Sequence, residues 1–199
     1  MESRLDLSDR QHSALIFDCD GTLADTAPVH YLAFSTATQA IGKRMPEAWY
    51  YDRLGISRYE LFSQFMTEHG ITFDVETVAE HSMAIYQANI SLIKEVELIA
   101  QVARENSKRT PMAVASGGQR AAVEATLSSI GLRSLFQHVV TVEDVTHGKP
   151  SPDLFLLAAQ RMGVAPQSCL VFEDSDEGLE AARRAGMEAI DVRIFTGRK

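Results

Sequence analysis

Short apolar runs alternate along the chain with longer segments in which apolar residues recur every three or four positions. The runs have the length of buried strands, and the recurring pattern is that of amphipathic helices. The predicted strands occupy residues 14–17, 111–115, 136–140, 169–172 and 188–192. The helices predicted between them occupy residues 90–106, 119–130, 152–162 and 177–185. Because strands that alternate with helices pair in parallel through right-handed crossovers, we predict a doubly wound, Rossmann-like α/β core.

The stretch between the first two predicted strands has a different pattern. Residues 26–90 contain helical periodicity and no strand-like run. The helices expected there cover residues 25–40, 47–54, 58–69 and 75–90. Ser57, with Glu60 three residues later, has the capping-box pattern of a helix start. We therefore predict an α/β core domain of residues 1–25 and 91–199, interrupted by a small all-helical domain of residues 26–90.

Composition and charge limit what the protein can be. Apolar residues make up 45% of the 199 positions and charged residues 23%, which is enough for a packed core and argues against disorder. The net charge of −8 lacks the basic footprint of a nucleic-acid-binding protein, and no apolar run approaches the roughly 20 residues of a membrane span. Residues 1–11 carry no apolar signal-peptide segment, so we expect a cytoplasmic protein. Cys19 and Cys169 are expected to be buried, reduced thiols.

Chemically reactive side chains follow four of the predicted strands. Asp18 and Asp20 come after the first strand, Ser116 after the second, Lys149 after the third and Asp174 after the fourth. Because the carboxyl ends of parallel strands meet at one edge of a sheet, we expect these side chains to converge. Two acids placed before a glycine turn are costly unless a cation or a chemical task keeps them charged.

A purely structural explanation of these residues is also open. Residues 18–22, Asp-Cys-Asp-Gly-Thr, could form a turn that only begins the next helix, with Asp25 or Thr26 as its N-cap. Ser116 could cap a helix in the same way, and Lys149 could be a solvated loop lysine. The expected convergence of four such loops on one sheet edge favours a functional site.

Phosphoryl transfer through an aspartate is the chemistry that uses such a set. An aspartate can act as nucleophile and carry the phosphoryl group, while a second acid protonates the leaving oxygen and later activates water. Asp18 and Asp174 offer the carboxylate oxygens that Mg²⁺ prefers. Glu173 is a further acid, either a ligand or a neighbour that reaches the metal through water.

The two remaining loops offer positive charge and hydrogen-bond donors. A transferring phosphoryl group carries spread negative charge, so catalysis needs cations and N–H groups directed at it. Lys149 would supply the charge, and Ser116 with the backbone of Gly117 would supply donors. Lys149 would also offset the mutual repulsion of the clustered acids.

In their order along the chain, these motifs resemble those of the haloacid dehalogenase-like hydrolases. Residues 18–22 are similar to the first motif of that superfamily and Ser116 to the second. Lys149 in Gly-Lys-Pro-Ser-Pro-Asp is similar to the third motif, and residues 172–175, Phe-Glu-Asp-Ser, to the fourth. The resemblance covers residues 14 to about 190, nearly the whole chain.

The resemblance implies a role for each matched residue. Asp18 would be nucleophile and metal ligand, and Asp20 would be the acid and base, with its carbonyl oxygen on the metal. Asp174 would complete a Mg²⁺ site, while Ser116 and Lys149 would bind the phosphoryl group. An aspartate at position 20 favours phosphoryl transfer over dehalogenation, because dehalogenases of the superfamily lack that second acid.

The helical insert is similar to the small cap domain of the β-phosphoglucomutase-like branch. The segment Asp25-Thr26-Ala27 with His30, and the segment Gly55-Ile56-Ser57-Arg58, resemble cap and hinge signatures of that branch. Arg58 is then a candidate for substrate contact or an exposed helix charge, and His30 a hinge contact or a structural histidine. Leu54 stands where the mutase pattern has a lysine, which favours a hydrolase.

The prediction is a Mg²⁺-dependent phosphatase acting on a small phosphorylated metabolite, with a sugar phosphate as the favoured class. A phosphosugar mutase is the first alternative, and a non-catalytic domain that binds phosphorylated metabolites is the second. The presence of Asp20 argues against the non-catalytic alternative, since a binding protein has no need of an acid and base at that position. We expect no nucleic-acid or membrane partner, and a monomer or weak homodimer.

Overall fold

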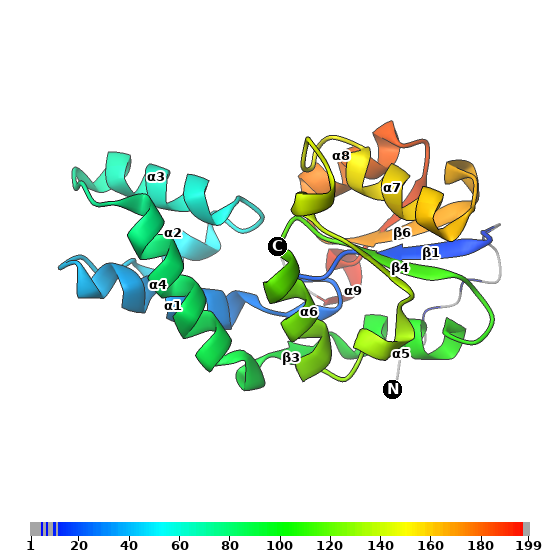
Figure 1. Cartoon of the computed structure of the whole chain (residues 1–199), viewed down its shortest axis with the longest axis horizontal. Coiled ribbons are helices and arrows are strands. Elements are labelled where there is room, and N and C mark those ends of the chain that lie inside the picture. The colour runs from blue at the N-terminus through cyan, green and yellow to red at the C-terminus, as the bar shows by residue number, and fades with distance from the viewer. Residues whose placement is uncertain (1–4, 6, 8–9, 11, 197–199) are drawn as a thin grey trace. The chain divides into compact units, whose positions relative to one another are not determined.

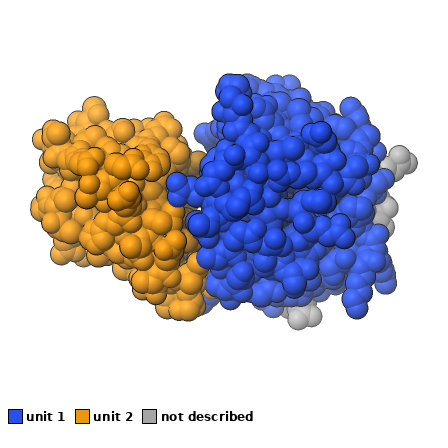
Figure 2. All heavy atoms as spheres, in the orientation of Figure 1, with its two compact units in different colours: residues 1–25, 94–199 blue, residues 26–93 orange. Residues whose placement is uncertain are grey.

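The computed structural model describes residues 5, 7, 10 and 12–196 (Figure 1). It divides into two compact units (Figure 2). One unit contains the described residues up to Asp25 and those from Lys94 onward, and the other is Thr26–Ile93. Each unit encloses a hydrophobic core of its own.

The larger unit is built on a five-stranded sheet in the order β5-β4-β1-β6-β7. All neighbouring strands are parallel, as predicted. The strands are β1 (Ala14–Phe17), β4 (Met112–Ala115), β5 (His138–Val140), β6 (Cys169–Glu173) and β7 (Glu188–Asp191). The chain order reverses at the central strand β1, which is the switch point where open α/β sheets bind ligands. The predicted doubly wound α/β fold is confirmed.

Helices cover both faces of this sheet. The helices are α5 (Glu97–Asn106), α6 (Arg120–Ser129), α7 (Asp153–Met162), α8 (Asp176–Arg184) and the short α9 (Arg193–Thr196). Residues of α5 and α6 share one buried cluster with Leu15 and Phe17 of β1. Residues of α7 and α8 share the other with Ala14 and Ile16. Strand β1 is thus buried on both sides, which explains its uninterrupted apolar sequence.

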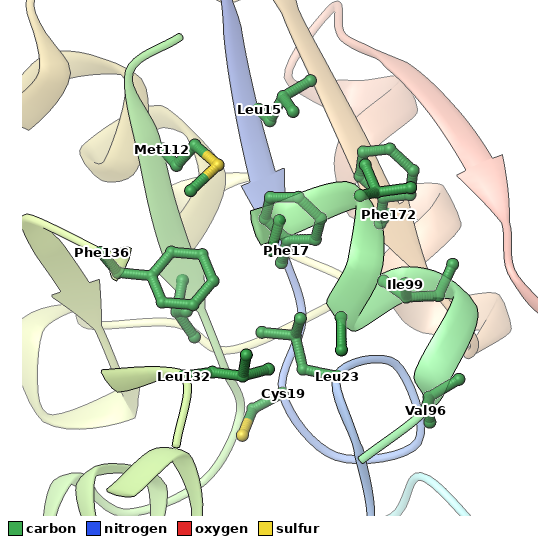
Figure 3. Close-up of a cluster of buried hydrophobic side chains, with 14 of the residues drawn as sticks. Leu15, Phe17, Cys19, Leu23, Val96, Ile99, Met112, Leu132, Phe136 and Phe172 are labelled. Carbon is green, nitrogen blue, oxygen red and sulfur yellow. The ribbon is translucent and has the colours of Figure 1, made fainter. Parts of the chain in front are cut away.

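An aromatic stack fixes the end of β1 where the first acid follows. The ring of Phe17 lies parallel to that of Phe172, with centroids 4.7 Å apart, and meets Phe136 edge-on at 5.7 Å (Figure 3). The side chain of Cys19 joins this buried cluster, and burial raises the pKa of its thiol well above the ordinary value. Cys19 is therefore an inert packing residue that anchors the loop between the two aspartates.

The smaller unit is all-helical. Its helices are α1 (Ala27–Ala40), α2 (Glu47–Tyr51), α3 (Arg58–His69) and α4 (Val75–Ala88), followed by a 3-10 turn at Ile90–Leu92. The predicted start of α3 has the expected cap, because the Ser57 side chain accepts a hydrogen bond from the backbone N–H of Glu60. Among the described residues, every helix is too short or too polar to cross a membrane.

Two local predictions are wrong. The single helix predicted over 90–106 is a 3-10 turn, a two-residue strand β3 (Lys94–Glu95) and α5. The first helix begins at Ala27, because Ala24–Asp25 forms a strand β2 that pairs antiparallel with β3. Two-residue strands are defined by backbone hydrogen bonds, which leave almost no side-chain pattern. The apolar spacing across residues 90–96 therefore imitates a helix.

Candidate active site

Three carboxylates meet at the carboxyl end of the sheet. Asp18 follows β1, Glu173 is the last residue of β6, and Asp174 is the next residue. Strands β1 and β6 pair in register with Phe17 opposite Phe172, so the residues that follow lie side by side. One carboxylate oxygen from each acid lies within 4.8 Å of those of the others.

Lys149 binds two of these acids at once. Its Nζ atom lies 2.6 Å from Asp18 Oδ1 and 2.6 Å from Glu173 Oε2, and its side chain is 10% exposed. The ammonium group also lies 5.0 Å from the ring centroid of Phe155. Burial alone would lower the pKa of Lys149, but Asp18 and Glu173 outweigh burial and hold that pKa above its usual value. Lys149 is therefore a fixed positive charge.

Burial and the excess of acids over lysine raise the pKa values of Asp18 and Asp174. Burial raises the pKa of Asp18 well above its ordinary value; Lys149 opposes this effect, while Glu173 and Asp174 add to it. Burial, with the nearby Glu173, raises the pKa of Asp174 to about 7. A divalent cation offsets the repulsion between clustered carboxylates, and hard oxygen donors are the ligands that Mg²⁺ prefers. The donor set of Asp18, Glu173 and Asp174 thus fits Mg²⁺.

Gly21 allows Asp174 to enter the site. Its backbone has φ +86°, a left-handed conformation that other residues rarely adopt. A Cβ atom at this position would lie 1.9 Å from Asp174 Oδ2. Beside it, the Thr22 hydroxyl donates to Asp174 Oδ1 at 3.2 Å. The Gly-Thr pair of the first motif therefore makes room for the distant acid and orients it.

Glu173, whose role the sequence leaves open, is held by both of its carboxylate oxygens. Oε1 accepts hydrogen bonds from the backbone N–H groups of Asp174 and Ser175, each at 3.0 Å, and from Ser175 Oγ at 2.8 Å. Oε2 accepts from Lys149. The carboxylate lies against α8, where a Cβ atom on Gly178 would be 2.0 Å from Glu173 Cδ. Glu173 thus links the first turn of α8 to Lys149.

The contact at Gly178 yields a testable prediction. Gly178→Ala is expected to push the Glu173 carboxylate out of its hydrogen bonds. The resulting overpacking should lower the free energy of unfolding by about 1–3 kcal/mol. Turnover should fall as well, because Lys149 loses one of its two anchors. Denaturant unfolding and steady-state kinetics measure the two effects.

Gly148→Ala is the matched control, because a Cβ atom there meets only Val142, at 3.9 Å. It should leave stability within about 0.5 kcal/mol of the wild type. Wild-type stability in Gly178→Ala would contradict the clash.

Asp20 and Ser116 come together around Gly118. A Cβ atom on Gly118 would lie 3.3 Å from Ser116 Oγ and 3.5 Å from Asp20 Oδ2. Two hydrogen bonds of Ser116 fix the loop that holds it. The Ser116 N–H donates to Val140 O at 2.9 Å, and Ser116 Oγ accepts from the N–H of Gly118 at 3.0 Å. The N-cap of α6 is Gln119, so Ser116 is not the cap of that helix.

Arg58 and His30 lie in the helical unit, where both make internal contacts. Arg58 Nη1 donates to Ala79 O at 3.2 Å and to Ser82 Oγ at 2.9 Å. His30 stacks on Tyr86, with ring centroids 4.3 Å apart. These contacts stabilise the helical unit, and a role of either residue toward substrate stays a prediction.

Four contributors escape sequence reasoning. Thr22 and Ser175 could have been suspected, since they lie within the first and fourth motifs. Gly178 and Phe155 carry no local signal, because each acts on a residue that the fold brings close to it.

Comparison with known proteins shows the family of the chain. A sequence model of the haloacid dehalogenase-like hydrolases matches residues 12–186. The fructose-1-phosphate phosphatase YqaB of Escherichia coli is 37% identical over 186 residues, covering 93% of this chain and 98% of its own. The phosphorylated carbohydrates phosphatase of Thermotoga maritima is 33% identical over 183 residues, covering 89% and 83%.

A solved structure has the same fold. The β-phosphoglucomutase of Clostridium difficile superposes with a TM-score of 0.78 at 24% identity, over 89% of this chain and 83% of its own. The family match covers most of the chain, and these two curated relatives are named phosphatases. The chain therefore belongs to the haloacid dehalogenase-like hydrolase family and is a phosphatase.

Proposed function

We propose that this phosphatase hydrolyses a small sugar phosphate through an aspartyl-phosphate on Asp18, with Mg²⁺ as its cofactor. The observation that carries the proposal is the Asp18 carboxylate at the sheet's switch point, 2.6 Å from Lys149 and beside Glu173 and Asp174. The names of the two curated relatives, which specify fructose 1-phosphate and phosphorylated carbohydrates, support the substrate class.

The proposed reaction has two displacements. An oxygen of Asp18 attacks phosphorus and the ester P–O bond breaks, while Asp20 gives its proton to the leaving alkoxide oxygen. Water then attacks the phosphorus of the aspartyl-phosphate and loses a proton to Asp20, which releases phosphate and restores both acids. Lys149 Nζ, the Ser116 hydroxyl and the Gly117 N–H stabilise the charge on the phosphoryl oxygens.

Asp18 and Asp174, with the carbonyl oxygen of Asp20, would hold the metal ion. Glu173 is a further candidate ligand, since one of its oxygens belongs to the same cluster. When bound, Mg²⁺ would supply positive charge that attracts the substrate phosphate and offsets the clustered acids.

We propose that the unit Thr26–Ile93 serves as the cap domain that selects the substrate. Arg58 and His30 are its candidate contacts to substrate and hinge. The side chain of Leu54 is apolar and 43% exposed, and it replaces the lysine of the mutase pattern, which favours water over a sugar as the phosphoryl acceptor. The buried free thiols of Cys19 and Cys169 are compatible with a reducing compartment, and we place the enzyme in the cytoplasm as a monomer or weak homodimer.

A substrate panel tests the proposal. With Mg²⁺, the purified chain should release inorganic phosphate from sugar phosphates, fructose 1-phosphate among them. EDTA should remove this activity and excess Mg²⁺ should restore it. Phosphate release is followed by a colorimetric assay, and sugar isomers are followed by chromatography. Isomer formation without free phosphate would indicate a mutase, and inactivity on the whole panel would overturn the proposed substrate class.

A further inference from the structure

A cluster of charged side chains connects the two loops that carry Ser116 and Lys149. We propose that this cluster, which we call the Asp144 clamp, positions both loops for phosphoryl transfer. It consists of Asp144, Glu143, Arg120 and Arg161, and lies outside the acid cluster of the active site. The inference rests on the proposed function, because it takes Ser116 and Lys149 as the residues that bind the phosphoryl group.

Asp144 is the centre of the clamp. It ends the 3-10 turn Val142–Asp144, which follows β5. Its Oδ1 accepts from Arg161 Nη2 at 2.9 Å, and its Oδ2 accepts from Arg120 Nη2 and from the backbone N–H of Thr141, the latter at 2.9 Å. The side chain is 16% exposed. Burial by itself would raise the pKa of Asp144, but Arg161, the Thr141 N–H and Arg120 outweigh it and lower the pKa to about 2.

One side of the clamp fixes the loop that carries Ser116. Arg120 is the first residue of α6, the helix into which this loop runs. The N-cap residue Gln119 makes no side-chain hydrogen bond to the helix. Instead, the backbone N–H of Arg120 donates to Glu143 Oε2 at 2.8 Å, so an acid from the 3-10 turn satisfies the helix start. Backbone and guanidinium of Arg120 are therefore both bound to the same turn.

The other side fixes the loop that carries Lys149. This loop starts directly after Asp144 and ends where α7 begins, at Asp153. Arg161 lies in the last turn of α7 and donates to Asp144, so one charge-assisted hydrogen bond ties the helix that follows the loop to the residue that precedes it. Arg120 and Arg161 also both donate to the backbone oxygen of Val139 in β5, at 3.3 and 3.2 Å. The clamp thereby ties α6, α7 and β5 together.

This arrangement suits a reaction that depends on small distances. Lys149 reaches Asp18 and Glu173 at 2.6 Å from a loop without regular structure. A displacement of about 1 Å in a catalytic group can cost roughly a hundredfold in rate. The clamp connects α6, which follows the Ser116 loop, with the turn and helix on either side of the Lys149 loop.

Glu188 offers a control. It begins β7, at the amino end of the sheet and away from the site, and its carboxylate binds Arg10. Replacing it removes a bond between a carboxylate and an arginine that involves neither loop of the site.

The test compares Asp144→Asn with Glu188→Gln in the full chain. In Asp144→Asn, kcat should fall by roughly ten- to a hundredfold, and more than KM rises, because the displaced lysine matters most in the transition state. The dissociation constant for inorganic phosphate, measured by calorimetry, should rise by about threefold or more. Glu188→Gln should keep the wild-type values of all three. Arg161→Lys, which keeps the charge but loses the guanidinium fork, should lower kcat by about three- to tenfold.

The outcomes separate the clamp from the proposed function. A wild-type chain that releases no phosphate overturns both. An active wild type with an Asp144→Asn variant of equal kcat and phosphate affinity overturns the clamp alone. If Asp144→Asn does not fold, Arg161→Lys decides: a lowered melting temperature with unchanged kcat would reduce the cluster to a structural role.

Discussion

Replacing Asp18 by asparagine should abolish turnover. The amide cannot form the aspartyl-phosphate, because it lacks the anionic oxygen that attacks phosphorus, and it removes one proposed metal ligand. Loss of a catalytic nucleophile lowers kcat by several orders of magnitude, and we expect at least about a 10⁴-fold decrease here. The measurement is single-turnover and steady-state phosphate release with Mg²⁺.

The asparagine variant should remain folded, since Lys149 keeps its bond to Glu173. Asp176→Asn is the matched control: its side chain is 84% exposed, two residues beyond the acid cluster, and it pairs with Arg193. This control should retain turnover. Activity of Asp18→Asn within tenfold of the wild type would overturn the mechanism.

Replacing Lys149 by methionine should have the second largest effect. Methionine keeps the apolar stem against Phe155 but removes the charge between Asp18 and Glu173. Removal of one electrostatic donor from such a site lowers kcat by about 10²–10³-fold. An uncompensated buried charge also lowers the free energy of unfolding, by roughly 3–5 kcal/mol.

The pH dependence of this variant follows from its charges. Lys149 lowers the pKa of Asp18 against burial, so its loss lets that pKa rise further. Because the attacking carboxylate must be ionised, the residual activity of Lys149→Met should shift toward higher pH. Lys108→Met, at an exposed position of the same unit, should leave both kcat and the pH profile unchanged. An unshifted profile in Lys149→Met would contradict the proposed coupling.

The centre of the sheet was predictable because β1, β4 and β6 are buried on both faces. Strands such as β1 and β6 therefore appear in the sequence as uninterrupted apolar runs. Their order along the chain, with helices between them, is sufficient to bring the four motifs to one edge. The β2–β3 pair was missed, since two-residue strands depend on backbone hydrogen bonds such as that from Val96 N–H to Leu23 O.

In the candidate site, the charged residues of the motifs could be predicted from the sequence. Asp18, Lys149 and Asp174 could be named because each directly follows a strand or lies in the next loop. The support around them could not be found from sequence. Gly178 resembles any helix glycine until Glu173 lies against it, and Arg161 resembles any solvated helix arginine until the fold brings it to Asp144.

The two arginines bound to Asp144 have a consequence beyond catalysis. Strand β5 is an outer strand, and the free backbone groups of an outer strand are a template on which another chain can add its own strand. Arg120 and Arg161 already occupy the backbone oxygen of Val139 in this strand. By binding this oxygen they remove one acceptor from the edge, so we expect the proposed Asp144 clamp to oppose edge-to-edge aggregation as well.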